Sequence, residues 1–215
     1  MTNHTVRMAA LLGKLRREMN GAVAESMQRG EGGYGLNYGV SIPTIRAIAG
    51  RVGTDHAFAR FLYRQDVREL RMAAPTIADP VSVTPDNVDE WFVGRMPEEL
   101  IEELALRLLS RCGRPVLDTL CGRWLRAGSG AERYAALMAL ARARVQEFDA
   151  EEVVEAVPDA VAACPDDLRL ARGAAAFVQS ASARIAPERL ARMIERLPDS
   201  RGGAYLRDEL AWMIL

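Results

Sequence analysis

The segment between residues 107 and 144 concentrates arginines, the side chains of this chain best suited to binding phosphate. Eight arginines stand there against two acids, Asp118 and Glu132. A guanidinium group grips phosphate through two parallel hydrogen bonds, so this run predicts a surface that contacts phosphates. The alternative is a solvated face without a ligand. The arginines are Arg107, Arg111, Arg114, Arg123, Arg126, Arg133, Arg142 and Arg144.

Because the chain as a whole is nearly neutral, a phosphate-binding surface can only be a local basic patch. The 28 basic and 29 acidic residues give a formal net charge of -1. That near-neutral total argues against a generic polyanion binder held by overall charge. Lys14 is the sole lysine, so arginine supplies the remaining basic residues.

Metal and nucleotide motifs are absent from the sequence. Its three cysteines form no C-x-x-C pair and its histidines number two, which argues against zinc and structural disulfides. The glycine run Gly30–Gly39 lacks the Gly-Lys-Ser/Thr of a phosphate loop, so we interpret it as a flexible connection. We therefore predict neither a metal nor a cofactor.

Length and composition predict a packed protein that does not enter a membrane. The 215 residues are 49% hydrophobic and 27% charged, and no linker divides them, so we expect one domain over residues 1–215. The apolar stretch Ala135–Ala141 is far shorter than the ~20 residues of a membrane span. With no signal-peptide core at the N-terminus, we expect a cytoplasmic protein.

Apolar residues recur every three or four positions, which predicts an all-α protein. Prolines near first helical turns mark several starts, and Asp66-x-x-Glu69 and Asp149-x-x-Glu152 look like capping boxes. The predicted helices are 5–28, 42–52, 55–64, 66–78, 85–95, 97–111, 113–127, 131–146, 149–163, 165–182, 187–197 and 200–214.

The spacing of these helices favours an α-solenoid of antiparallel pairs. Pairs begin near Pro97, Ala131 and Pro165, a period of roughly 33–35 residues that suits HEAT-like repeats. An ordinary helical bundle is the alternative. In a solenoid the second helices line a concave surface that is open to a partner.

Three sequence blocks resemble the DNA alkylation repair family, the AlkD-like, HEAT-like alkylpurine DNA glycosylases. Gly39–Ala49 is similar to that family's G-V-x-x-P-x-L/I-R-x-I/L-A signature. Asp66–Ala73 looks like its H-E-x-R-x-x-A segment, with Arg68 in place of the histidine. Asn87–Trp91 falls where the family carries a W-D-x-x-D helix. The resemblance covers about residues 5–200 and is strongest before Trp91.

This resemblance implies duplex DNA, possibly alkylated, as the partner. In the family a tryptophan and an aspartate contact the sugar of the alkylated nucleotide, where a carboxylate stabilises the developing positive charge. Trp91 matches that tryptophan, whereas Phe92 and Arg95 replace the acids. Arg95, one helical turn beyond Trp91, would place like charge beside the cation, so weak or absent base excision is expected. Glu98 is a possible substitute acid, and Trp91 is alternatively a core residue.

Two later blocks are looser. Ala131–Ala136 resembles the family's W-x-R-R-x-A helix and retains Arg133, with Tyr134 in the second arginine position. Arg172–Ala176 aligns roughly with K-A-x-G-W-x-L-R, without the aromatic residue. Trp124 and Trp212 are expected in the core. A scaffold that binds a protein partner is the alternative function. The predicted nucleic-acid-binding residues are Trp91, Arg95, Arg133, Arg142 and Arg172, with no catalytic residue.

Overall fold

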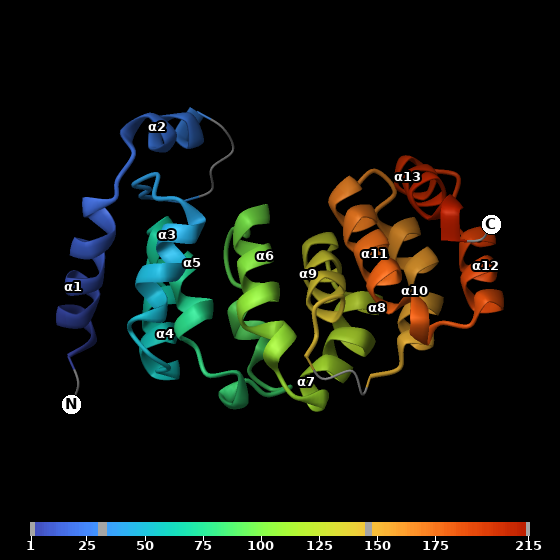
Figure 1. Ribbon diagram of the computed structural model, residues 1–215, viewed down its shortest axis with the longest axis horizontal. Helices are drawn as coiled ribbons and strands as arrows, with labels where there is room; N and C mark the ends of the chain where they lie inside the picture. Colours follow the sequence, from blue (N-terminus) through green and yellow to red (C-terminus); the bar gives the residue numbers. More distant parts are fainter. Residues whose placement is uncertain (1–2, 30–33, 145–147, 214–215) are drawn as a thin grey trace. The chain divides into compact units, whose positions relative to one another are not determined.

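The computed structural model describes residues 3–29, 34–144 and 148–213 (Figure 1). Its regular structure is helical, and within these ranges the one β feature is an isolated bridge between Leu36 and Val67. The all-α prediction is therefore confirmed. None of the described helices is both long and apolar enough to cross a membrane.

The chain folds as two compact units. Unit 1 comprises Met1–Val83 and Asp89–Leu108, and unit 2 comprises Thr84–Val88 and Leu109–Leu215. The expectation of a single domain stays a prediction. Each unit has its own buried apolar core, which includes Leu70 and Leu104 in unit 1 and Leu137 and Phe177 in unit 2.

Unit 1 places three helices, α3, α5 and α6, parallel to one another. Arg68 at the start of α5 pairs with Glu99 at the start of α6, and Arg107 at the end of α6 reaches Thr76 near the end of α5. Arg68 also donates to the carbonyl of Val40, just before α3. The helices of unit 1 are α1 His4–Arg17, α2 Gly21–Arg29, α3 Ile42–Gly50, α4 His56–Tyr63, α5 Arg68–Ile77 and α6 Glu98–Arg107, with a 3-10 helix at Pro80–Ser82.

Unit 2 repeats this parallel arrangement with α9, α11 and α13. The centre of α11 packs closely on α9, since a Cβ atom on Gly173 would lie 2.8 Å from the Tyr134 ring. At the start of α13 the amide of Gly202 donates to the carbonyl of Pro165, just before α11. The helices of unit 2 are α7 Arg114–Thr119, a π-helix at Leu120–Trp124, α8 Leu125–Ala127, α9 Gly130–Leu140, α10 Ala150–Ala163, α11 Leu168–Ala181, α12 Pro187–Glu195 and α13 Arg201–Leu210. Short 3-10 helices lie at Leu109–Arg111, Ser182–Arg184 and Ala211–Met213.

Local capping explains many of the helix starts. Asp149 caps α10 by accepting hydrogen bonds from the amides of Glu151 and Glu152, as predicted. The predicted cap at Asp66 is wrong. The N-cap of α5 is Val67, and Asp66 instead accepts from the amide of Gly35 at 2.9 Å.

Predicted helices 5–28, 85–95 and 131–146 differ from the structure; the last of them ends at Leu140, and its residues 145 and 146 lie outside the described ranges. The segment 5–28 contains two helices, because Asn20 caps the start of α2 through the amide of Val23 and gives its own amide to the carbonyl of Tyr38. The segment 85–95 holds a 3-10 helix, Val88–Trp91, which spans the boundary between the units. Of the glycine run, residues 30–33 lie outside the described ranges, and its later part connects α2 to α3 without helix.

Candidate nucleic-acid interface

Trp91 is a core residue. Its side chain is 0% exposed. The indole packs edge-on against His56, with ring centroids 5.7 Å apart, and at a tilt against Tyr63, with centroids 4.9 Å apart. The Arg60 guanidinium lies 5.4 Å from its ring centroid. The prediction that Trp91 contacts DNA is therefore wrong, and its alternative placement in the core is confirmed.

The backbone of Trp91, like its ring, is held by contacts with α4. The Tyr63 hydroxyl donates to the Trp91 carbonyl at 2.7 Å. Burial raises the pKa of Tyr63 far above its usual value, so this hydroxyl remains a protonated donor. Trp91 thus anchors the segment that follows it to α4.

Arg95 does not share a helical face with Trp91. The 3-10 helix ends at Trp91, and Gly94 has a φ of +67°, a left-handed conformation that interrupts any helix. Arg95 follows in an exposed loop, and Glu98 begins the separate helix α6 after Pro97. The expected juxtaposition of Arg95 and Trp91 on one helix is therefore wrong.

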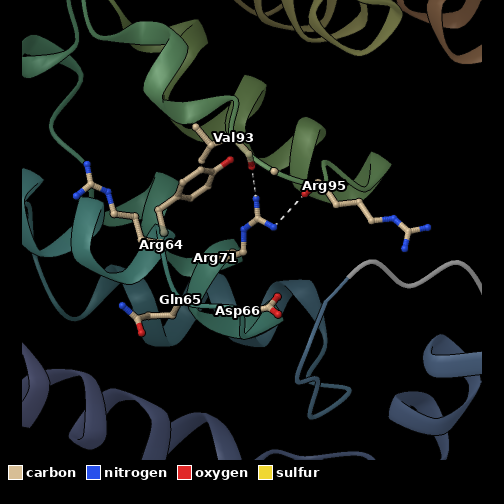
Figure 2. A pocket seen from close by; sticks show the side chains of 8 residues that line it. Arg64, Gln65, Asp66, Arg71, Val93 and Arg95 are labelled. Carbon is tan, nitrogen blue, oxygen red and sulfur yellow. Dashed lines mark hydrogen bonds between the residues drawn. The ribbon is translucent and has the colours of Figure 1, made fainter.

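Arg95 instead borders a hollow in unit 1 (Figure 2). The cavity has a volume of about 430 Å³. Its walls come from the end of α4 and the turn after it, from Arg71 on α5, and from the loop at residues 93–95. Three arginines and one acid line it, so the site is electropositive. The lining residues are Tyr63, Arg64, Gln65, Asp66, Arg71, Val93, Gly94 and Arg95.

Arg71 fastens the loop of this hollow to α5. It donates to the carbonyl of Arg95 at 3.0 Å and to that of Val93 at 3.2 Å, as Figure 2 shows. Its guanidinium carbon lies 5.2 Å from the ring centroid of Tyr63 and 5.9 Å from that of Tyr34. Arg71 is 7% exposed, and its Nε finds no acceptor among the described residues.

A buried polar cluster beside the hollow was not predicted from the sequence. Glu69, which is 0% exposed, accepts hydrogen bonds from the amides of Tyr38 and Val40 and from Arg68. Arg68 also forms two 2.7 Å hydrogen bonds to Glu99. The available signal was an adjacent Arg-Glu pair, Arg68 and Glu69, at the start of a helix whose later residues are mostly apolar. Here these two residues bond to backbone and to each other.

Arg133 is also structural. It is 9% exposed and donates to the carbonyls of Leu125 at 3.1 Å and Arg126 at 3.0 Å, which belong to α8. A further contact reaches the Cys164 sulfur at 3.6 Å. Because residues 133–140 of α9 are buried throughout, this guanidinium is directed to protein carbonyls. The prediction that Arg133 contacts phosphate is therefore wrong.

Arg142 and Arg172 are both exposed on unit 2. Arg142 follows α9, donates to the Met138 carbonyl at 3.3 Å, and lines a second hollow of about 470 Å³ with Ala141, Ala176, Gln179 and Ser180. Arg172 lies one helical turn before Ala176, so it shares that face of α11. The structure thus brings Arg142 to the helix face that carries Arg172.

Two other exposed arginines of the run form only solvent-exposed ion pairs in the described residues. Arg114 pairs with Asp118 at 3.4 Å and Arg126 with Glu152 at 2.9 Å, and all four side chains are about half exposed or more. Exposed ion pairs of this kind contribute little free energy, so phosphate can compete for the guanidinium groups. Within the described ranges, no group of three or more His, Cys, Asp or Glu side chains is arranged to hold a metal ion.

Comparison with known proteins shows the fold. No family model matches the sequence, and no curated protein does. One solved structure is similar over 96% of this chain and 95% of its own, with a TM-score of 0.68 and 16% identity. It is described as a new family of proteins related to the HEAT-like repeat DNA glycosylases with affinity for branched DNA structures. The chain therefore has the HEAT-like helical-repeat fold that its helix spacing predicted.

Proposed function

We propose that this protein binds DNA through exposed arginines of unit 2, that it prefers branched over linear duplex DNA, and that it excises bases weakly or not at all. The observation that carries the proposal is the exposure of Arg142, just after α9, and of Arg172, one turn before Ala176 on α11, the residue that lines a hollow with Arg142. The fold likeness to a protein with affinity for branched DNA supports it.

Charge distribution explains how a protein with a net charge of -1 could bind a polyanion. Phosphate contacts from a local group of arginines release counterions from DNA, and this release supplies much of the affinity. Arg114, Arg123, Arg126, Arg142 and Arg144 are all exposed in unit 2. Their region of the chain carries few acids, so a phosphate backbone meets little repulsion there.

Weak or absent excision follows from the surroundings of Trp91. A glycosylase of the AlkD-like kind needs an aromatic face and a carboxylate at the sugar of the damaged nucleotide. Here the indole is buried, and the positions expected to carry acids hold Phe92 and Arg95. We therefore expect the protein to bind DNA that contains alkylated purines without excising those bases.

The test is a binding series with the full chain and fluorescent DNA. A four-way junction, a fork and a linear duplex of equal length are titrated by anisotropy at 50, 100 and 200 mM salt, on the order of concentrations where phosphate contacts respond steeply. We expect tighter binding to the branched DNA, weakening as salt rises. The double variant Arg142→Gln/Arg172→Gln should bind all three more weakly, and Arg201→Gln, an exposed arginine at the start of α13, is the matched control.

Two results would overturn the proposal in different ways. Absence of affinity at 50 mM salt would remove DNA binding and favour a scaffold for a protein partner. Release of 3-methyladenine or 7-methylguanine from methylated DNA at the rate of an active glycosylase would refute the expectation of weak or absent excision.

A further inference from the structure

Arg71 is a buried cation in the wall of the unit 1 hollow. The residue is 93% buried, yet it forms no ion pair with a carboxylate of the described residues. Its neighbour Arg68 is equally buried and pairs with both Glu69 and Glu99. Buried cations are ordinarily paired with an anion, because carbonyl dipoles replace only part of the lost hydration.

One donor of the Arg71 guanidinium is also unsatisfied and buried among the described residues. Its two terminal nitrogens are occupied by the carbonyls of Val93 and Arg95, whereas its Nε lacks an acceptor among the described residues. A donor left unsatisfied in a buried position costs free energy. Because Arg71 forms part of the wall of the unit 1 hollow, an anion bound there would lie beside a buried guanidinium that has no carboxylate partner among the described residues.

Two further arginines stand at the same hollow. The Arg64 side chain is 69% exposed, and Arg95 lies in the exposed loop. In Figure 2 their side chains extend to either side of Arg71. Exposed arginines change rotamer readily, so both can turn toward an anion. The acids nearby are Asp66, which accepts from the Gly35 amide, and Glu90, 3.7 Å from Arg64. The arginines outnumber them.

From this geometry we infer that the unit 1 hollow binds the terminal phosphate of an unpaired DNA strand end, held by Arg64, Arg71 and Arg95. A volume of about 430 Å³ is in the range of small-ligand sites, so it admits a phosphate with its nucleotide but not a duplex. A terminal phosphate carries up to two negative charges and three acceptor oxygens, which three guanidinium groups match. This inference rests on the proposed DNA binding and adds an end-recognition site to it.

The experiment compares forked DNA molecules that differ in one group. Their unpaired arms end in either a phosphate or a hydroxyl, at the 5′ or the 3′ end, and affinity is measured by anisotropy with the full chain. We expect about tenfold tighter binding of phosphate-ended arms, the scale of a charge-assisted hydrogen bond. Arg64→Gln and Arg95→Gln should each abolish most of that preference while hydroxyl-ended DNA binds as before. Arg51→Gln, an exposed arginine of unit 1 outside the hollow, should retain it.

The outcomes separate this inference from the proposed function. Equal binding of phosphate and hydroxyl ends, with affinity still lowered by Arg142→Gln, would overturn the end site and leave DNA binding intact. If the wild type shows no affinity for any of these DNA molecules, the proposed function itself is refuted. Displacement of phosphate-ended DNA by equimolar deoxynucleoside monophosphate or inorganic phosphate would show that the hollow takes free phosphates, and would overturn the assignment to strand ends.

Arg71 is tested by ligand-induced stabilisation, because its substitution also loosens the loop at residues 93–95. A phosphate-ended single strand should raise the melting temperature of the wild type and not that of Arg64→Gln or Arg95→Gln. In Arg71→Lys, which keeps the charge but loses the planar fork, the rise should be smaller. A full rise in all three variants would place the phosphate elsewhere.

Discussion

The buried carboxylate of Glu69 accepts a hydrogen bond from the backbone amide of Val40 at 3.3 Å. This hydrogen bond joins the start of α5 to the segment that leads into α3. Arg68, next to Glu69, donates to the carbonyl of the same Val40 at 2.8 Å. Val40 and Glu69 belong to the first two of the sequence blocks that resemble alkylation repair proteins. Their order and spacing in the sequence therefore correspond to a contact in the fold, and the contact is structural.

Replacing Glu69 by alanine should destabilise the protein by about 3–5 kcal/mol, because Arg68 and two amides would lose a buried charged partner. Glu69→Gln, which retains an acceptor, should cost less. Urea unfolding followed by circular dichroism measures both. Glu188→Ala, at an exposed position on α12, is the control and should change the free energy of unfolding by less than about 0.5 kcal/mol. An equally small effect at Glu69 would contradict its role.

Trp91→Ala should destabilise the protein by about 3–5 kcal/mol through the cavity it creates. Trp91→Phe should cost less, and no hydrogen bond is lost because the indole Nε1 finds no acceptor among the described residues. Both variants should bind DNA normally when folded. A Trp91→Ala protein with wild-type unfolding free energy and no DNA affinity would mean that the indole is exposed and binds DNA.

Arg142→Gln and Arg172→Gln should each weaken DNA binding without lowering stability. If each arginine contacts one phosphate, the slope of log affinity against log salt should fall by about 0.9 per substitution. Arg133→Gln is the informative contrast, since it should lower the melting temperature by releasing the Leu125 and Arg126 carbonyls. An unchanged salt slope in the double variant Arg142→Gln/Arg172→Gln would exclude these two residues from the interface.

Asp55 should make folding sensitive to acid. It caps α4 through the Phe58 amide at 3.0 Å and pairs with Arg7 at 2.7 Å. These interactions, the amide hydrogen bond foremost, hold the pKa of Asp55 below its usual value of 3.8. A lowered folded-state pKa contributes stability that is complete above the unfolded value and is lost as pH falls through the folded value.

The free energy of unfolding should therefore decline below about pH 4. Asp55→Asn retains a capping oxygen but cannot titrate, so its decline should be shallower. Urea unfolding at pH 3, 4, 5 and 7 measures the difference. Parallel curves for the wild type and the variant would show that the Asp55 carboxyl has the same pKa in both states.

Cys121 should resist alkylation in the folded protein. Burial, helped by Glu152 and Asp118, raises the pKa of its thiol to about 12, so very little thiolate exists at pH 8. Iodoacetamide followed by mass spectrometry should label Cys164, which is half-buried, ahead of Cys121. In urea the two should react at similar rates. Fast labelling of Cys121 without denaturant would contradict its burial.

Local signals predicted most of the helices. The cap at Asp149 and the proline at the start of α12 act within one turn, so they are readable from neighbouring residues alone. Longer-range constraints account for the differences. Asn20, at the start of α2, donates its amide to the distant carbonyl of Tyr38. Trp212, expected in the core, is 64% exposed in a 3-10 turn after α13. Trp124, at 1%, is buried as expected.

Residue order alone specified the helical class, the repeat spacing and the abundance of arginine, because propensity, capping and apolar periodicity are local properties. It did not specify which arginines reach solvent. Arg133 lies in the buried part of α9, whereas Arg142 lies beyond the end of that helix and is exposed. Gly94, with its positive φ, interrupts the chain between Trp91 and Arg95, so the two do not share a helix face. Burial depends on what packs against each face, and that depends on the tertiary fold.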